Sequence, residues 1–173
     1  GTAPEGSGVI VSNNGLIVTA SHVVSRATNI IVRDINGNMF NAEIIFDDPL
    51  TDLALLKTKI NNNKININLK RPKIGSNTCL ISNSFGLDLN ITCGIVSSNR
   101  KSGIGFNSKE DFIQIDAAAN PGSSGGAVVN ENGELIGIMS GIFTKQSDTN
   151  VGVNFAISSE LLIETISHLL KWV

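Results

Sequence analysis

The sequence predicts an all-β domain, and two observations support that prediction. Short apolar runs rich in Ile and Val recur along the 173 residues, and polar turn signals separate them. The clearest turns are Asn13-Asn14-Gly15, Asn36-Gly37-Asn38 and Glu131-Asn132-Gly133. This spacing is typical of many short antiparallel strands in a barrel or a sandwich, and the chain is long enough to bury a core of its own.

Only the C-terminal segment departs from this pattern. From Ser158 onward, apolar residues repeat at helical spacing, namely Leu162, Ile166, Leu169, Leu170 and Val173. We therefore expect an amphipathic helix at the end of the chain. His168 lies within it, and we expect this histidine to be an ordinary helical residue, because a place on a helix supplies no chemical role.

The composition excludes several classes of function. The formal net charge is −2 and the basic residues are scattered, so the chain lacks the positive patch that nucleic-acid binding needs. No apolar run approaches the roughly 20 residues that span a bilayer, so we expect no integral membrane segment. We expect neither a metal nor a cofactor. The chain begins at Gly1 without a methionine or a leader, which is typical of a mature or trimmed fragment.

The most informative stretch is the loop Asn120-Pro121-Gly122-Ser123-Ser124-Gly125-Gly126. Glycines reach backbone angles that other residues avoid, so such a loop can turn sharply and point bare N–H groups at the carbonyl that a serine attacks. A serine hydroxyl is a poor nucleophile near neutral pH, so it needs a base and a group that orients the base. The loop therefore predicts an acyl-transfer site with two partners elsewhere in the chain.

The best candidate for the base is His22, which follows the apolar run Leu16-Ile17-Val18 at the expected end of a buried strand. The best candidate for the orienting group is Asp52, at the head of the apolar residues 53–56. A carboxylate in that place is costly to bury unless it is hydrogen-bonded, and an imidazole N–H can satisfy it.

Two other aspartates compete with Asp52. Asp47 and Asp48 precede Pro49 in an expected turn, where aspartates are common for local backbone reasons, so Asp52 is favoured. With that choice the order along the chain is His, Asp, Ser. This is the order in chymotrypsin and not the Ser, Asp, His order of α/β-hydrolases.

These residues and further blocks in the same order resemble the protease domain of the HtrA (Deg) family of trypsin-like serine proteases over nearly the whole chain. The blocks are Gly6-Ser7-Gly8-Val9-Ile10-Val11, Thr19-Ala20-Ser21-His22-Val23-Val24, Asp52-Leu53-Ala54-Leu55-Leu56-Lys57, Asn83-Ser84-Phe85-Gly86, Thr92-Cys93-Gly94-Ile95-Val96-Ser97, Gln114-Ile115-Asp116-Ala117-Ala118 and Gly152-Val153-Asn154-Phe155-Ala156-Ile157. The resemblance implies a double six-stranded antiparallel β-barrel with a C-terminal helix. The N-terminal barrel would cover about residues 1–72, the C-terminal barrel about 73–157 and the helix about 158–172, with the active site between the barrels.

The resemblance also implies catalytic roles. Ser124 would be the nucleophile, His22 the general base and then acid, and Asp52 the group that fixes the imidazole tautomer. The backbone N–H groups of Gly122 and Ser124 would form the oxyanion hole. Ser123, where the family usually has Asn, would set the orientation of the peptide between them.

The same resemblance implies a substrate site. Ala118, six residues before the nucleophile, would form the bottom of the specificity pocket, and without a carboxylate there an Arg or Lys side chain would be buried unpaired. The other residues expected to pair with the substrate backbone or to narrow the pocket are Met139, Ser140, Gly141, Ile142, Phe143 and Phe155. We expect a serine endopeptidase that cleaves after small or medium aliphatic residues. Met139 also replaces an Asn that supports the buried aspartate in the family, so we expect Asp52 to have fewer hydrogen bonds.

Two other interpretations stay open. Residues 122–126 also satisfy G-x-S-x-G, and Asp148 and His168 follow in the order of an α/β-hydrolase esterase. Against an esterase, the residues after the serine, Ala127-Val128-Val129, are typical of a hairpin and not of a helix. The second alternative is a catalytically inactive or regulated protease fold that binds peptides or acts as a chaperone-like scaffold.

Cys79 and Cys93 flank an expected hairpin turn near residues 83–88, where they can face each other as a disulfide or remain two reduced thiols. By resemblance, the partners would be unfolded or misfolded polypeptides in a quality-control role. The location would be periplasmic, secreted or organellar. The family commonly forms homotrimers through an N-terminal segment and carries PDZ domains after the protease domain, so we expect this chain to be a trimmed protein or a lone protease domain.

Overall fold

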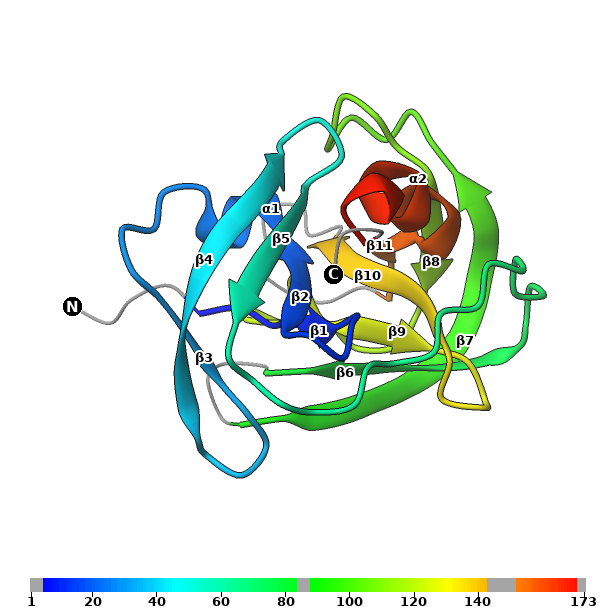
Figure 1. Ribbon diagram of the computed structural model, residues 1–173. Helices are drawn as coiled ribbons and strands as arrows, with labels where there is room; N and C mark the ends of the chain where they lie inside the picture. Colours follow the sequence, from blue (N-terminus) through cyan, green and yellow to red (C-terminus); the bar gives the residue numbers. More distant parts are fainter. Residues whose placement is uncertain (1–4, 84–87, 143–151, 171–173) are drawn as a thin grey trace.

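A computed structural model describes residues 5–83, 88–142 and 152–170 of the chain. Figure 1 shows two β units side by side, with a helix after the second. The predicted all-β fold with two units and a C-terminal helix is confirmed. The expected pocket residue Phe143, the alternative acid Asp148 and residues 84–87 lie outside the described residues.

The N-terminal unit is an antiparallel sheet with the strand order β1-β2-β5-β4-β3. The strands are β1 (Val9–Ile10), β2 (Leu16–Ala20), β3 (Ile30–Arg33), β4 (Met39–Asp48) and β5 (Leu53–Thr58). A one-turn helix, α1 (Ser21–Val24), follows β2. The strands β2 and β5 are apolar on both faces because the two faces pack in different cores. Leu16 and Leu55 face the core shared with the second unit, while Ile17 and Leu56 face the core of the first.

The N-terminal unit has five strands among the described residues, where six were expected. The segment that follows β5 begins with the exposed polar residues 61–64 and then hydrogen-bonds to both units instead of forming a strand. The N–H of Ile65 donates to the carbonyl of Ile10 (3.0 Å), and the N–H of Asn68 donates to the carbonyl of Leu135 (2.9 Å). This segment therefore joins the two units.

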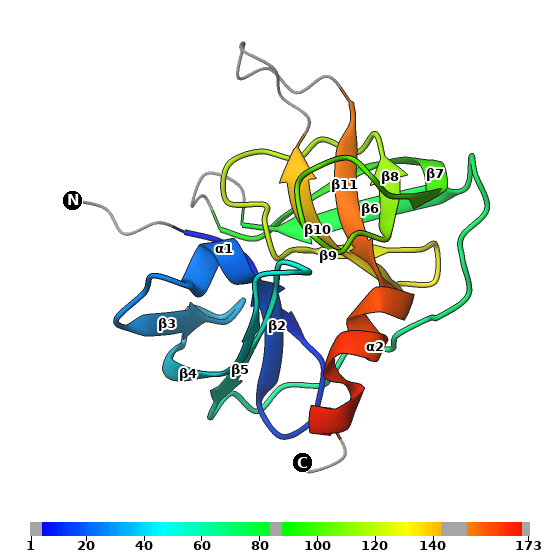
Figure 2. The same cartoon turned by 90° about the horizontal axis from the view of Figure 1, so that it is seen from above.

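The C-terminal unit is a closed barrel with the strand order β10-β11-β8-β7-β6-β9. Its strands are β6 (Asn77–Ser82), β7 (Asn90–Lys101), β8 (Phe112–Ile115), β9 (Ala127–Val129), β10 (Leu135–Ile142) and β11 (Asn154–Ser158). Helix α2 (Ser159–Leu170) follows β11 and packs against β10 and β11, beside the junction of the two units (Figure 2). Within the described residues, neither helix is long and apolar enough to cross a membrane.

Three apolar clusters hold the fold together. One is the core of the N-terminal unit and one is the core of the barrel. The third lies between the units and collects Leu16 and Leu55 from the first, Phe112 and Ile138 from the barrel, and Leu162 from α2. Because this shared cluster is buried, the two units and the helix are fixed relative to one another, and so is the cleft between them.

The two cysteines form a disulfide. Cys79 on β6 and Cys93 on β7 are directly opposite each other in the strand register. Of the two states that the sequence left open, the structure has the bonded one, and no cysteine of the chain is free.

Candidate active site

The strand register of the N-terminal sheet brings His22 and Asp52 together. Strands β2 and β5 are antiparallel neighbours, with Ala20 opposite Leu53. The residues that follow β2, Ser21 and His22, therefore lie beside Asp52, which immediately precedes β5. The N–H of Ser21 donates to the Asp52 carbonyl (2.9 Å), and the N–H of His22 donates to Asp52 Oδ1 (2.9 Å).

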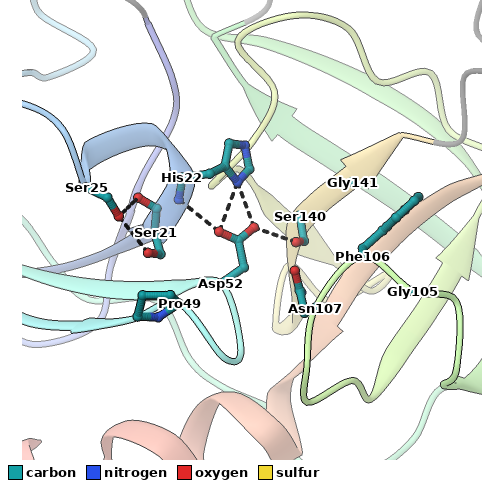
Figure 3. A pocket seen from close by; sticks show the side chains of 10 residues that line it. All are labelled: Ser21, His22, Ser25, Pro49, Asp52, Gly105, Phe106, Asn107, Ser140 and Gly141. Atoms are coloured by element: carbon teal, nitrogen blue, oxygen red, sulfur yellow. Dashed lines mark hydrogen bonds and ion pairs between the residues drawn. The ribbon is translucent and has the colours of Figure 1, made fainter.

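The Asp52 carboxylate is buried and well supplied with hydrogen bonds. Its residue is 6% exposed, and its φ of 66° is uncommon for a residue other than glycine. His22 Nδ1 lies 2.9 and 2.7 Å from the two carboxylate oxygens, and the Ser140 hydroxyl donates to Oδ2 at 2.7 Å. Figure 3 shows the His22 ring and Ser140 converging on this carboxylate from the two sides of the cleft.

The expectation that Met139 leaves Asp52 short of hydrogen bonds is wrong. Met139 is 1% exposed and its side chain packs in the barrel core. The next residue, Ser140, lies at the irregularity in the register of β10 between Met139 and Gly141, and its side chain faces Asp52 instead of the barrel core. The Ser140 hydroxyl donates the hydrogen bond to Asp52 that was expected from the side chain at position 139, so the donor lies one residue further along the chain.

The nucleophile candidate lies on the other side of the imidazole. Ser124 Oγ is 3.1 Å from His22 Nε2, within the reach expected of a nucleophile and its base. It is also 3.5 Å from the carbonyl oxygen of Ser140. The Asp52 carboxylate, which hydrogen-bonds to Nδ1, raises the pKa of His22 above its ordinary value, against the opposing effect of burial.

The loop around Ser124 can be followed peptide by peptide. The N–H of Ser123 donates to the Asn120 carbonyl and the N–H of Gly126 to the Ser123 carbonyl, both at 2.9 Å. The N–H of Gly125 donates to the carbonyl of Met139 at 2.8 Å. In the part of the chain that the structure describes, the N–H groups of Gly122 and Ser124 have no protein acceptor. They are the two that the sequence predicted for an oxyanion hole.

Glycine is required where this loop approaches its surroundings. Gly122 and Gly125 have φ of 94° and 87°. A Cβ on Gly125 would lie 2.0 Å from the carbonyl oxygen of Ser7 and 2.5 Å from Thr19 Oγ1. Ser123 is fully buried, and its hydroxyl accepts the N–H of Asn120 (3.0 Å). The loop conformation therefore depends on the absence of side chains at two positions and on a small polar one at a third.

A cavity of about 640 Å³ opens beside the histidine. Both units line it (Figure 3). The lining residues are Ser21, His22, Ser25, Pro49 and Asp52 from the N-terminal unit, and Gly105, Phe106, Asn107, Ser140 and Gly141 from the barrel.

Comparison with known proteins identifies the family. The sequence matches the trypsin-like peptidase domain over residues 6–138. It is 40% identical over 171 residues to the periplasmic serine endoprotease DegP of Escherichia coli K12, and 40% identical over 171 residues to the serine endoprotease DegS of the same strain. The chain belongs to the HtrA family of trypsin-like peptidase domains. The resemblance drawn from the motifs is confirmed.

Solved structures agree with this assignment. The HtrA-type protease AlgW with decapeptide superposes with a TM-score of 0.90 at 39% identity, covering 96% of this chain and 51% of that one. The serine endoprotease from Yersinia pestis gives a TM-score of 0.82 at 39% identity, with 96% and 57% covered. The HtrA domain described here spans 36% of the length of DegP and 48% of DegS.

One loop of the HtrA domain that lines the cavity is built on a single carboxylate. Glu110 accepts the N–H groups of Ile104, Gly105, Phe106 and Asn107, at distances of 2.6 to 3.3 Å. Burial disfavours the charge of Glu110, but the four backbone donors outweigh it and lower the pKa of this carboxyl. Neither Glu110 nor the loop could be recognised from the sequence, because an isolated Glu among polar residues forms no motif.

Phe106 from that loop lies against the strand β10. A Cβ on Gly141 would be 2.7 Å from Phe106 Cδ2, so this close approach requires glycine. The Phe106 ring also contacts Phe155 and Phe112, with centroids 5.7 and 6.4 Å apart. Phe106 is 43% exposed and forms one wall of the cavity.

The residues predicted to bind substrate are in different situations. Ala118 is exposed, Ser140 and Gly141 line the cavity, and Phe155 is 3% exposed. The backbone of Ile142 pairs with β11, and its side chain lies outside the described part. The side chain of Met139 is buried, and its backbone N–H and carbonyl both bond to the loop after Ser124.

The esterase alternative is wrong. The fold is not an α/β-hydrolase, and the strand β9 follows the serine loop directly. His168 lies on α2, where its ring packs edge-on against Phe46 with centroids 5.7 Å apart. Among the described residues, no group of three or more His, Cys, Asp or Glu is placed to hold a metal ion.

Proposed function

We propose that this domain is a serine endopeptidase that hydrolyses peptide bonds through an acyl-enzyme. The observation that carries the proposal is the continuous line of contacts from Asp52 through His22 to Ser124, with 2.7 Å at Nδ1 and 3.1 Å at Nε2. Ser124 Oγ attacks the scissile carbonyl as His22 Nε2 takes its proton, and the imidazolium then passes that proton to the leaving amine. Asp52 keeps Nδ1 protonated and stabilises the imidazolium. Water repeats the sequence to release the acyl group.

The negative oxygen of the tetrahedral intermediate would be held by the N–H groups of Gly122 and Ser124. Their lack of a protein acceptor among the described residues supports this role, because an oxyanion hole needs donors that are not already used. Ser123 contributes its position: its buried hydroxyl and its two backbone hydrogen bonds fix the peptides on either side.

We propose a preference for small or medium aliphatic residues before the scissile bond. Ala118 places no carboxylate at the expected bottom of the pocket, and the buried aromatic Phe155 would restrict the size of that pocket. Ser140 and Gly141 on β10 would pair with the substrate backbone. A peptide library should show cleavage after Val and Ala, and efficient cleavage after Arg would contradict this specificity.

The natural substrates would be unfolded polypeptides in a quality-control role. Relatives with 40% identity are named as endoproteases, and DegP as periplasmic, which supports a periplasmic location here. An unfolded protein such as reduced, alkylated casein should be degraded faster than a stable folded one. Equal rates for the two would contradict the quality-control role and leave the peptidase proposal intact.

The triad is tested by comparing His22→Ala with His168→Ala on a fluorogenic peptide. We expect the first change to lower kcat/KM on the order of 10⁴-fold or more, since nucleophile and base act as a unit. We expect the second to change it by less than about twofold, because His168 packs on Phe46 and does not line the cavity. A folded wild-type chain without turnover would instead support the inactive, peptide-binding alternative.

A further inference from the structure

The motif Gly6-Ser7-Gly8 has no part in the proposed chemistry, yet Ser7 touches the nucleophile loop twice. Its N–H donates to the carbonyl oxygen of Ser124 at 2.9 Å. Its hydroxyl donates to the carbonyl oxygen of Gly122 at 2.7 Å, across 115 residues of sequence. Ser7 therefore binds the carbonyls of the nucleophile and of the residue that begins the predicted oxyanion hole.

Ser7 is itself held from both β units. Its hydroxyl accepts the N–H of Asn83, which follows β6 of the barrel, at 2.8 Å. Its carbonyl accepts the hydroxyl of Thr19 on β2 at 2.7 Å. The hydroxyl oxygen of Ser7 accepts from Asn83, so the hydroxyl proton is left to donate to the Gly122 carbonyl.

This hydrogen bond holds the carbonyl end of the peptide that follows Gly122, while the N–H end, from Ser123, is held by the Asn120 carbonyl. It matters because Gly122 cannot fix its own conformation. At a φ of 94° it occupies a region that only glycine visits freely, and a glycine peptide rotates more easily than any other. The Gly122 carbonyl has no other protein donor among the described residues. Rotation of the peptide after Gly122 would displace the next peptide of the loop, which carries the N–H of Ser124.

We propose that Ser7 is a positioning residue, whose hydroxyl selects the catalytic orientation of the oxyanion loop by donating to the Gly122 carbonyl. The inference rests on the proposed peptidase function. It assigns a role to a side chain that touches neither the substrate nor the reacting atoms. Removing the hydroxyl leaves the backbone N–H of Ser7 on Ser124 and leaves His22 and Asp52 untouched.

The test compares Ser7→Ala with Ser12→Ala in the full chain, using a fluorogenic peptide. Ser12 is a matched control in the same N-terminal segment: its hydroxyl accepts the N–H groups of Asn14 and Leu16, and it does not line the cavity. For Ser7→Ala we expect kcat to fall by about 10- to 100-fold, less than the loss of a whole oxyanion donor, with KM changed by less than about threefold. For Ser12→Ala we expect both constants within about twofold of wild type.

Two further readouts separate positioning from a loss of structure. The acid limb of kcat/KM should keep its wild-type midpoint in Ser7→Ala, because the contacts of His22 are unchanged. Ser7→Thr, which keeps the hydroxyl, should recover most of the lost kcat. An unchanged kcat in Ser7→Ala would overturn the inference, and so would a Thr variant as slow as the Ala variant although folded. If wild type itself had no Ser124-dependent turnover, the peptidase proposal would fail instead.

Discussion

The two sides of the cleft are built in different ways. On the N-terminal side, His22 and Asp52 are 30 residues apart and are brought together by one pair of neighbouring strands, β2 and β5. On the barrel side, Ser124 lies in a loop whose peptides are held by Met139 and by Ser7, which is 115 residues from the Gly122 that it contacts. The base side is therefore fixed mainly by local contacts within the N-terminal sheet, with one further donor, Ser140, from the barrel. The nucleophile side is fixed by long-range hydrogen bonds to the main chain, so it can be disturbed without changing a catalytic atom.

The largest effect on the local side is expected for Asp52→Asn. The change should lower kcat/KM about 10⁴-fold, because the amide favours the wrong imidazole tautomer. His22 acts as a base only when neutral, so kcat/KM falls as the pH drops below the pKa of His22. Asp52 holds that pKa above 6.5, so the variant should move the acid limb to lower pH. Asp34→Asn, in a surface turn, is the control. An acid limb that stays in place would mean that Asp52 does not act on His22.

On the long-range side, Gly125→Ala should have the largest effect. The added Cβ would meet the Ser7 carbonyl at 2.0 Å, so the loop must move, and we expect kcat to fall about 10²- to 10³-fold, as for a lost oxyanion donor. Gly133→Ala is a matched control, since Gly133 also has a positive φ (74°) but has no atom within 4 Å of its Cβ position. Circular dichroism should show both variants folded. Equal activity of the two would refute the dependence on loop packing.

A smaller effect is expected for Ser140→Ala, which removes the donor that crosses from the barrel to Asp52. Loss of one hydrogen bond to a charged group should lower kcat/KM about 5- to 20-fold. The half-buried Ser98, whose hydroxyl makes only a 3.5 Å contact, provides the control variant Ser98→Ala. If Ser140→Ala matched this control, Asp52 would not need its third partner.

The smallest effect is expected for Glu110→Gln, which acts on the cavity wall and not on the triad. The amide would turn a donor toward backbone N–H groups, loosening the loop that carries Phe106, so KM for peptides should rise about three- to tenfold while kcat stays within twofold. The lowered pKa of Glu110 means that its stabilising effect is present above 4.5 and is lost as the pH falls through the folded-state pKa. The variant should lose this dependence on pH in acid unfolding curves, while Glu43→Gln should keep it. If Glu110→Gln changed kcat and left KM unchanged, Glu110 would not act through the cavity wall.

The local side of the site could be predicted from the sequence, and much of the other side could not. His22 and Asp52 each adjoin an apolar strand, and that pattern can be recognised in the sequence alone. The sequence does not show that Ser140, and not Met139, supplies the hydrogen bond to Asp52, because this depends on where each of the two side chains points in the folded strand β10. Ser7 lies in one of the sequence blocks that resemble the family, but its contact with Gly122 exists only once the two units have packed together. The absence of a sixth strand from the described part of the N-terminal unit has the same origin, since residues 65–68 bond to both units.

The central claim, that Ser124 is an activated nucleophile in a competent loop, is tested most directly by labelling with a fluorophosphonate and measuring the intact mass. Wild type should gain one adduct, located at Ser124 by digestion, and its rate of labelling should fall as the pH drops through the raised pKa of His22. Ser124→Ala should gain none, and His22→Ala should react at least 10³-fold more slowly. Folded wild-type protein that gains no adduct, or an adduct that persists in Ser124→Ala, would contradict the claim.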